Sequence, residues 1–235
     1  MKEQKPSTES TNRRTGGIRS GRPWAGVLLA LAVMFSANSV SAQLDLGADV
    51  VSRYVWRGVD FGSSAAVQPW IGYAAGNLEV GAWSSWSLSS PGANENDLYA
   101  SYRVGDFGVT LTDYFFPALP GADGTYGFFE FDPDATGHIV EVLGSGAFGD
   151  FGVAAGVNVF GDDDNSIYIE GSYDFYEEGD VSSGLVVGLG NGVYTTDGEF
   201  APVQVGLSAS RGSYFASYVI NPDMEVNWLY FGLSL

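Results

Sequence analysis

Charged side chains recur on alternate residues of this chain, a spacing that predicts an electrostatic role rather than catalysis. Asp45, Asp49, Arg53 and Arg57 share one parity, while the other parity of the same segment is apolar. Successive side chains of a strand point to opposite faces, so these four would line one wall. Later segments repeat the pattern, which predicts ten pore-lining residues: Asp45, Asp49, Arg53, Arg57, Glu79, Asp97, Arg103, Glu141, Glu170 and Asp174. An alternative remains open, in which these charges pair and fill a narrow closed barrel.

Motifs for catalysis, cofactors or metals are weak. His138 is the only histidine, and Val140 stands where certain lipid deacylases carry a serine, so no Ser-His-acid enzyme is expected. Residues 144–149 fit a dinucleotide glycine pattern, but an alternating strand-like segment follows instead of a helix. Residues 132–137 resemble the start of an EF-hand loop without its acid at position twelve. Residues 162–165 read better as an exposed hairpin loop than as a cation site, so no cofactor or metal is predicted.

The elements that must position these residues are strands. Apolar and polar residues alternate with a period of two, and the apolar parity is rich in aliphatic and aromatic residues. The pattern predicts twelve strands: 44–58, 66–75, 78–88, 97–104, 107–116, 137–145, 151–160, 166–176, 184–195, 201–210, 213–220 and 225–235.

Links between these segments alternate in length. Short links follow the even-numbered segments and carry tight-turn residues: Gly76-Asn77, Gly105-Asp106 and Arg211-Gly212. Links after odd-numbered segments are usually longer, as at 89–96 and 117–136, although 145–150 and 177–183 are long for short-side turns. Such alternation is typical of an outer-membrane barrel with both ends in the periplasm.

The first 42 residues have the composition of an export signal. Six basic residues precede an apolar stretch from Trp24 to Phe35, and small residues end the segment at Ala42. The apolar stretch is shorter than the roughly 20 residues that span a bilayer as a helix. We therefore predict a cleaved secretory signal at 1–42 and a mature domain at 43–235.

Composition excludes several classes of protein. The chain has a net charge of −18, and residues 43–235 hold four basic against 26 acidic residues. Such a chain is repelled by phosphate backbones, so no nucleic-acid partner is expected. The absence of cysteine excludes disulfides and thiolate metal sites. A hydrophobic fraction of 45% is too high for a disordered acidic chain.

A transmembrane barrel is favoured over the main alternative, a soluble exported β-sandwich. Aromatic residues gather near segment ends, as interfacial girdles do: Tyr54, Trp56, Trp70, Trp86, Tyr114, Phe116, Tyr176 and Trp228. Alternating Leu229, Phe231, Leu233 and Leu235 close the chain in the manner of barrels that assembly machinery recognises, although the last residue is not aromatic. With the polar parity inside, Val50 and Tyr54 are predicted to face lipid.

The segment Ser52-Arg53-Tyr54-Val55-Trp56-Arg57-Gly58 resembles the opening motif of the TorF-type putative porin family. The resemblance continues loosely over residues 44–235 and implies an outer-membrane barrel that conducts solutes. Together with the pattern, it predicts an all-β, antiparallel up-and-down barrel of about twelve strands. The expected function is passive diffusion of small hydrophilic solutes, with cations preferred. Two alternatives are kept: a structural or interaction barrel plugged by side chains and the 117–136 loop, and an outer-membrane enzyme.

Overall fold

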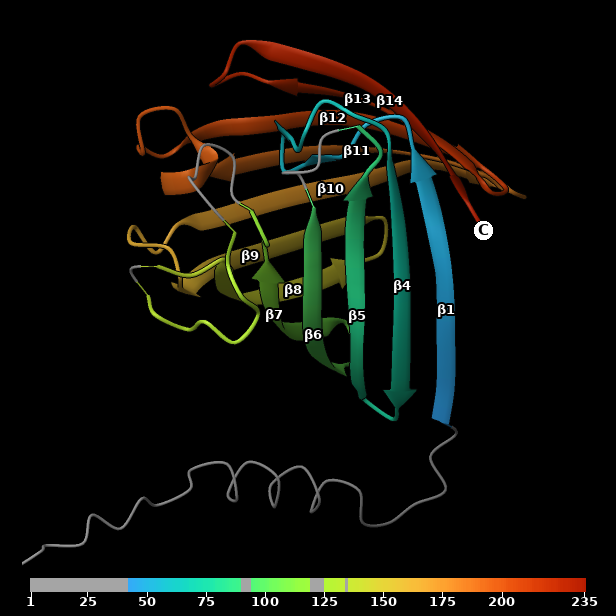
Figure 1. Ribbon diagram of the computed structural model, residues 1–235. Helices are drawn as coiled ribbons and strands as arrows, with labels where there is room; N and C mark the ends of the chain where they lie inside the picture. The colour runs from blue at the N-terminus through green and yellow to red at the C-terminus, as the bar shows by residue number, and fades with distance from the viewer. Residues whose placement is uncertain (1–41, 90–93, 119–124, 134) are drawn as a thin grey trace, which may run out of the picture. The chain divides into compact units, whose positions relative to one another are not determined.

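The described part of the chain is built mainly from one β-sheet that closes into a barrel. The computed structural model describes residues 42–89, 94–118, 125–133 and 135–235, so the predicted signal lies, except for Ala42, outside the described residues. Twelve strands form a closed antiparallel barrel in the order β1-β14-β13-β12-β11-β10-β9-β8-β7-β6-β5-β4 (Figure 1). The predicted all-β class and strand number are confirmed. Among the described residues, no helix has the length and apolar character needed to cross a membrane.

Two further short strands, β2 and β3, pair only with each other. The strands, in chain order, are β1 (Ala42–Val51), β2 (Val55–Trp56), β3 (Val59–Asp60), β4 (Ala66–Ala75), β5 (Leu78–Ser87), β6 (Glu95–Val104), β7 (Phe107–Phe115), β8 (His138–Phe148), β9 (Phe151–Phe160), β10 (Ile167–Glu178), β11 (Val181–Gly190), β12 (Ala201–Arg211), β13 (Tyr214–Asn221) and β14 (Val226–Ser234). One turn of 3-10 helix, η1 (Gly192–Tyr194), follows β11.

The apolar parity of each strand faces outward. Leu46 on β1 and Phe231 on β14 are each 66% exposed, and Leu111 on β7 and Leu207 on β12 are also exposed. These side chains cannot pack inside, because the neighbouring residues of the same strands occupy the interior. The barrel therefore has an apolar outer wall and a largely polar inner wall.

Two-residue turns join the strands at one end of the barrel. Each begins with a glycine at positive φ: Gly76, Gly105, Gly149, Gly179 and Gly212. Glycine at the first central position suits the type II′ turn, whose twist matches that of antiparallel strands. Strands β8 and β10 run to Phe148 and Glu178, so the links at 145–150 and 177–183 are shorter than the sequence indicated.

Closure joins β1 to its two neighbours unequally. β1 pairs with β4 over ten residue pairs, from Ala42↔Ala75 to Val51↔Ala66. It pairs with β14 over three, and the amide of Leu235 donates to the carbonyl of Ala48 at 2.9 Å. The C-terminus consequently lies beside β1 (Figure 1). The predicted closing strand at the C-terminus is confirmed.

The predicted first strand, 44–58, is wrong at its C-terminal end. β1 ends at Val51, and the chain turns away before β4 begins at Ala66. Tyr54 was predicted to face lipid, yet it is buried with Val51 and Ala66 on the inner side. Other residues assigned to an interfacial girdle also lie on the inner side: Trp56 and Tyr114 line an interior cavity, and Trp70 pairs across the strands with Trp83. Trp86, in contrast, faces outward.

Candidate functional site

Residues 52–65, here called the inner hairpin, fold into the barrel interior between β1 and β4. Within it β2 pairs with β3, and the amide of Phe61 donates to the carbonyl of Tyr54 at 2.8 Å. The two residues at its tip, Arg57 and Gly58, have φ of 49° and 76°. Positive φ at both central positions is the requirement of a type I′ turn. Gly58 is also needed for space, because a Cβ there would lie 2.0 Å from the carbonyl oxygen of Val203.

Contacts around the whole barrel hold the inner hairpin in place. Tyr54 packs on Trp83 of β5, and Phe61 stacks on Phe116 just beyond β7. The side-chain amide of Asn221, on β13, donates to the carbonyl of Gly58 at 2.9 Å. Strands β5 and β7 are separated only by β6, whereas β13 lies on the opposite side of the barrel from β7, so the hairpin crosses the lumen.

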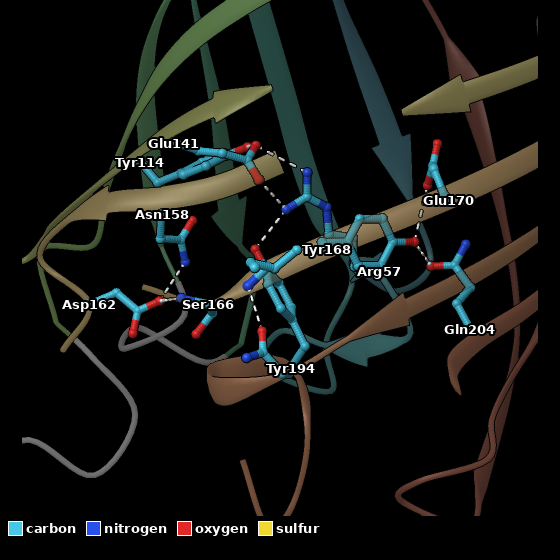
Figure 2. Close-up of polar contacts among 12 residues, drawn as sticks. Arg57, Tyr114, Glu141, Asn158, Asp162, Ser166, Tyr168, Glu170, Tyr194 and Gln204 are labelled. Carbon is cyan, nitrogen blue, oxygen red and sulfur yellow. Dashed lines mark hydrogen bonds and ion pairs between the residues drawn. The ribbon is translucent and has the colours of Figure 1, made fainter. Parts of the chain in front are cut away.

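Arg57 is the best-anchored residue of the inner hairpin. Its guanidinium donates to both carboxylate oxygens of Glu141 on β8, at 2.6 and 3.0 Å, and to the hydroxyl of Tyr194 at 2.6 Å. The carbon of the guanidinium lies 4.2 Å from the ring centre of Trp56 and 4.3 Å from that of Tyr168. Figure 2 shows the guanidinium beside Glu141, Tyr194 and Tyr168. A planar cation thus has two-point pairing with a carboxylate and aromatic faces beside it.

Hydrogen bonds extend outward from Arg57 to the barrel wall. The hydroxyl of Tyr114 donates to Glu141 at 2.9 Å. The hydroxyl of Tyr168 donates to Glu170 at 3.0 Å and lies 3.5 Å from the side-chain oxygen of Gln204 (Figure 2). Glu141 is 1% exposed, and a buried carboxylate without a cation would be strongly destabilising. Arg57 supplies the cation that pairs with Glu141 at this place.

Two cavities lie on either side of the inner hairpin. One has a volume of about 440 Å³ and reaches toward the short turns. Its lining includes Thr112, Tyr114, Glu170 and Gln204 beside Arg57. The other has about 350 Å³ and reaches toward the long loops. It is mainly apolar and is lined by Val59, Phe61, Phe116, Ile139 and Val193, among others. Trp56 and Tyr114 line both cavities and so lie between them.

The predicted pore-lining residues divide into two groups. Eight lie on barrel strands with the inward parity: Asp45, Asp49, Glu79, Asp97, Arg103, Glu141, Glu170 and Asp174. Arg53 and Arg57 belong to the inner hairpin instead of the first strand. Arg53 pairs with Asp60 of the same hairpin, and Arg57 pairs with another member of the predicted set, Glu141. A pore-lining role for the set stays a prediction.

Sequence reasoning missed several interior residues. Glu95 is 2% exposed and lies two residues before Asp97 on the same face of β6. One carboxyl oxygen of each has no hydrogen-bond partner in the part of the chain that the structure describes. Because Glu95 and Asp97 have the same parity, the alternation could have identified Glu95 as an interior residue. The strand was instead predicted to begin at 97. No local sequence pattern singled out Tyr168 and Tyr194, because both act through their contacts with Arg57.

The plug suggested for the 117–136 loop stays a prediction, because part of this loop, which follows β7, lies outside the described residues. Its described residues pack against His138 outside the inner wall: Phe128 and Phe131 contact the imidazole ring. His138 is fully buried, with Nδ1 2.9 Å from the carboxylate of Asp113 and Nε2 2.8 Å from the carbonyl of Phe128. Both ring nitrogens are therefore engaged in structural bonds. In the described ranges, no group of three or more His, Cys, Asp or Glu residues could hold a metal ion.

Asp162 organises the loop between β9 and β10. Its carboxylate accepts from the side chain of Asn158 at 2.7 Å and from the backbone amides of Asp164 and Ser166. Burial by itself would raise the pKa of Asp162, but these hydrogen bonds outweigh it, so the pKa lies below its ordinary value. The carboxylate fixes the amide of Asn158, which lines the apolar cavity.

Comparison with known proteins gives one family. Residues 36–230 match the family model described as bacterial protein of unknown function (Gcw_chp). A search of curated proteins found no match.

Proposed function

Because the chain belongs to the Gcw_chp family of bacterial proteins, whose function is unknown, we propose its role from the barrel itself. We propose that it is an outer-membrane channel for small hydrophilic solutes, narrowed by the inner hairpin and selective for cations. The observation that carries the proposal is the polar cavity of about 440 Å³ inside a closed barrel. An interior built only for stability would be expected to fill this space with side chains.

An outer-membrane location is supported by the outer wall. Side chains such as Leu46, Phe107, Leu229 and Phe231 are each more than half exposed, on strands far apart in the sequence. In water, apolar surface on this scale leads to aggregation. In a bilayer it is the solvated surface, and a closed barrel leaves few backbone groups unpaired. Lipids of that membrane and the barrel-assembly machinery are the partners we propose.

Cation preference is supported by the charges of the inner wall. Carboxylates outnumber guanidinium groups there, and both arginines of the inner hairpin are already paired with carboxylates, Arg53 with Asp60 and Arg57 with Glu141. Uncompensated carboxylates lower the free energy of an entering cation and raise that of an anion. The screening length is about 10 Å at 0.1 M salt, so the preference should fade in concentrated salt.

Location and conduction are tested separately. A barrel protein should need detergent for extraction and migrate differently on gels before and after boiling. Recovery in the soluble periplasmic fraction would contradict the location. For conduction, purified protein in a planar bilayer should give discrete current steps and a cation-selective reversal potential under a salt gradient. The double variant Arg53→Ala/Arg57→Ala exposes Asp60 and Glu141 and should strengthen that preference.

A structural barrel with a closed lumen is the second candidate, and the inner hairpin favours it. Its tip is fixed by Glu141, Tyr194 and Asn221, and its base by aromatic packing. If neither the native protein nor the double variant conducts, the channel proposal fails and the closed barrel takes its place. We propose no catalytic role for either form, since both nitrogens of His138 are held in structural bonds.

A further inference from the structure

The larger cavity combines carboxylates with aromatic side chains. Its volume, about 440 Å³, lies within the range of about 300–1,000 Å³ that holds small-molecule ligands. Four aromatic residues line it: Trp56, Tyr114, Tyr168 and Tyr230. Its ionisable carboxyl and guanidinium groups are Arg57, Glu141 and Glu170. The cavity therefore offers both a charged wall and an aromatic one.

Pairing inside the cavity leaves one carboxylate without a cation. Arg57 and Glu141 neutralise each other through two hydrogen bonds. Among the described residues, no basic side chain pairs with Glu170. The hydroxyl of Tyr168 donates to one oxygen of Glu170 and so orients the carboxylate (Figure 2). The net charge of the lining is thus negative and is concentrated at Glu170.

The inner wall already binds one organic cation, the guanidinium of Arg57. Carboxylate and hydroxyl oxygens meet its edge while Trp56 and Tyr168 lie against its faces. Aromatic rings favour weakly hydrated organic cations, whereas Ca²⁺ and Mg²⁺ need several oxygen ligands or retained waters. In the described part of the chain, no group of three or more His, Cys, Asp or Glu side chains could hold a metal ion.

We infer that this cavity is a binding site for a small organic cation carrying a single positive charge, paired with Glu170 and packed on the aromatic wall. The inference deepens the proposed channel and rests on it, because a solute reaches Glu170 through the lumen. It names the class of solute that the narrow part of the barrel selects: guanidinium and alkylammonium compounds.

Binding is measured on the purified full barrel in micelles by ligand-observed saturation-transfer NMR. The probes are methylguanidinium and tetramethylammonium chloride, with methylurea as the neutral counterpart and potassium chloride as a competitor. Glu170→Gln removes the charge and keeps the shape. Glu178→Gln is the matched control, because Glu178 lies on the same strand and accepts from Tyr176 at 3.0 Å, as Glu170 does from Tyr168. Glu178 is exposed at the strand end, outside the cavity.

Loss of a charge-assisted contact should weaken binding of both organic cations to Glu170→Gln by about tenfold or more. The Glu178→Gln variant should bind like the native protein, and methylurea should not compete. Equal binding by the native protein and Glu170→Gln would overturn the inference, as would equal displacement by potassium ions. Since no bilayer is involved, absence of conductance alone would refute the channel and leave this site standing. Conductance without Glu170-dependent binding would refute the site alone.

Discussion

Replacing Arg57 with methionine should release the inner hairpin while the barrel stays folded. Methionine keeps much of the length of arginine and can still lie between Trp56 and Tyr168, so the change isolates the charge. It removes the two bonds to Glu141 and the bond to Tyr194. Breaking a buried ion pair by removing one partner costs about 3–5 kcal/mol. Glu141 lines the adjoining cavity, from which water can reach the unpaired carboxylate of the variant, so we expect the lower end of that range.

Hydrogen exchange measures this effect at the place where it occurs. The amide of Phe61 is bonded to Tyr54 inside the hairpin, and its protection reports the free energy of hairpin opening. About 3 kcal/mol corresponds to a loss of protection of about a hundredfold. Amides of the barrel strands should be unaffected, because their ladders do not depend on Arg57.

Arg211→Met is the control for this experiment. Arg211 pairs with Asp180 at 3.9 Å, and its side chain is 80% exposed. An exposed pair of this kind contributes little to stability, so exchange throughout the protein should match the native pattern. Unchanged protection of the Phe61 amide in Arg57→Met would refute the reasoning that the ion pair anchors the hairpin. Loss of protection across all strands would show that the hairpin supports the whole barrel.

Three further predictions follow from the walls, the turn and the loop. In vesicles, cysteine at Asp45 should react with a water-soluble thiol reagent while cysteine at Leu46 reacts only with a membrane-soluble one; the reverse would show that the faces are inverted. Gly58→Ala should destabilise hairpin docking by about 1–3 kcal/mol, measured by hydrogen exchange, because φ is positive and a β12 carbonyl lies in the way. Gly105→Ala, also at positive φ but in open space, should cost less. Because hydrogen bonds lower its pKa in the folded state, Asp162 should stabilise its loop above about pH 4 and lose that effect as pH falls through the folded pKa. Asp162→Asn should abolish the pH dependence of proteolysis in this loop.

The amino-acid sequence determined the barrel. Alternation with a period of two is a local property, so strands such as β4 (Ala66–Ala75) and β9 (Phe151–Phe160) could be predicted to the residue. Turn glycines such as Gly76 and Gly105 are equally local, because the backbone there needs positive φ. Parity also determined which side chains face inward. Once one side chain of a strand is assigned to a face, the faces of the others follow by alternation.

Only the tertiary structure decided where the chain leaves the first strand. Arg53 and Arg57 continue the polar parity of Asp45 and Asp49, so nothing in the local pattern ends the strand at Val51. The hairpin is held in place by hydrogen bonds to residues that are distant in the sequence. Glu141 lies 84 positions after Arg57, and Tyr194 lies 137 positions after it. Contacts of that separation leave no local trace in the alternation.

The charge distribution of the lumen was likewise decided in three dimensions. Glu141 and Glu170 have the same residue type and the same inward parity, and either could have paired with Arg57. The hairpin places the guanidinium on Glu141, within 3.0 Å of both carboxylate oxygens, and leaves Glu170 bonded to Tyr168. Sequence determines how many charges line the barrel, but pairing depends on distance, and distance across the barrel is set by the folded chain.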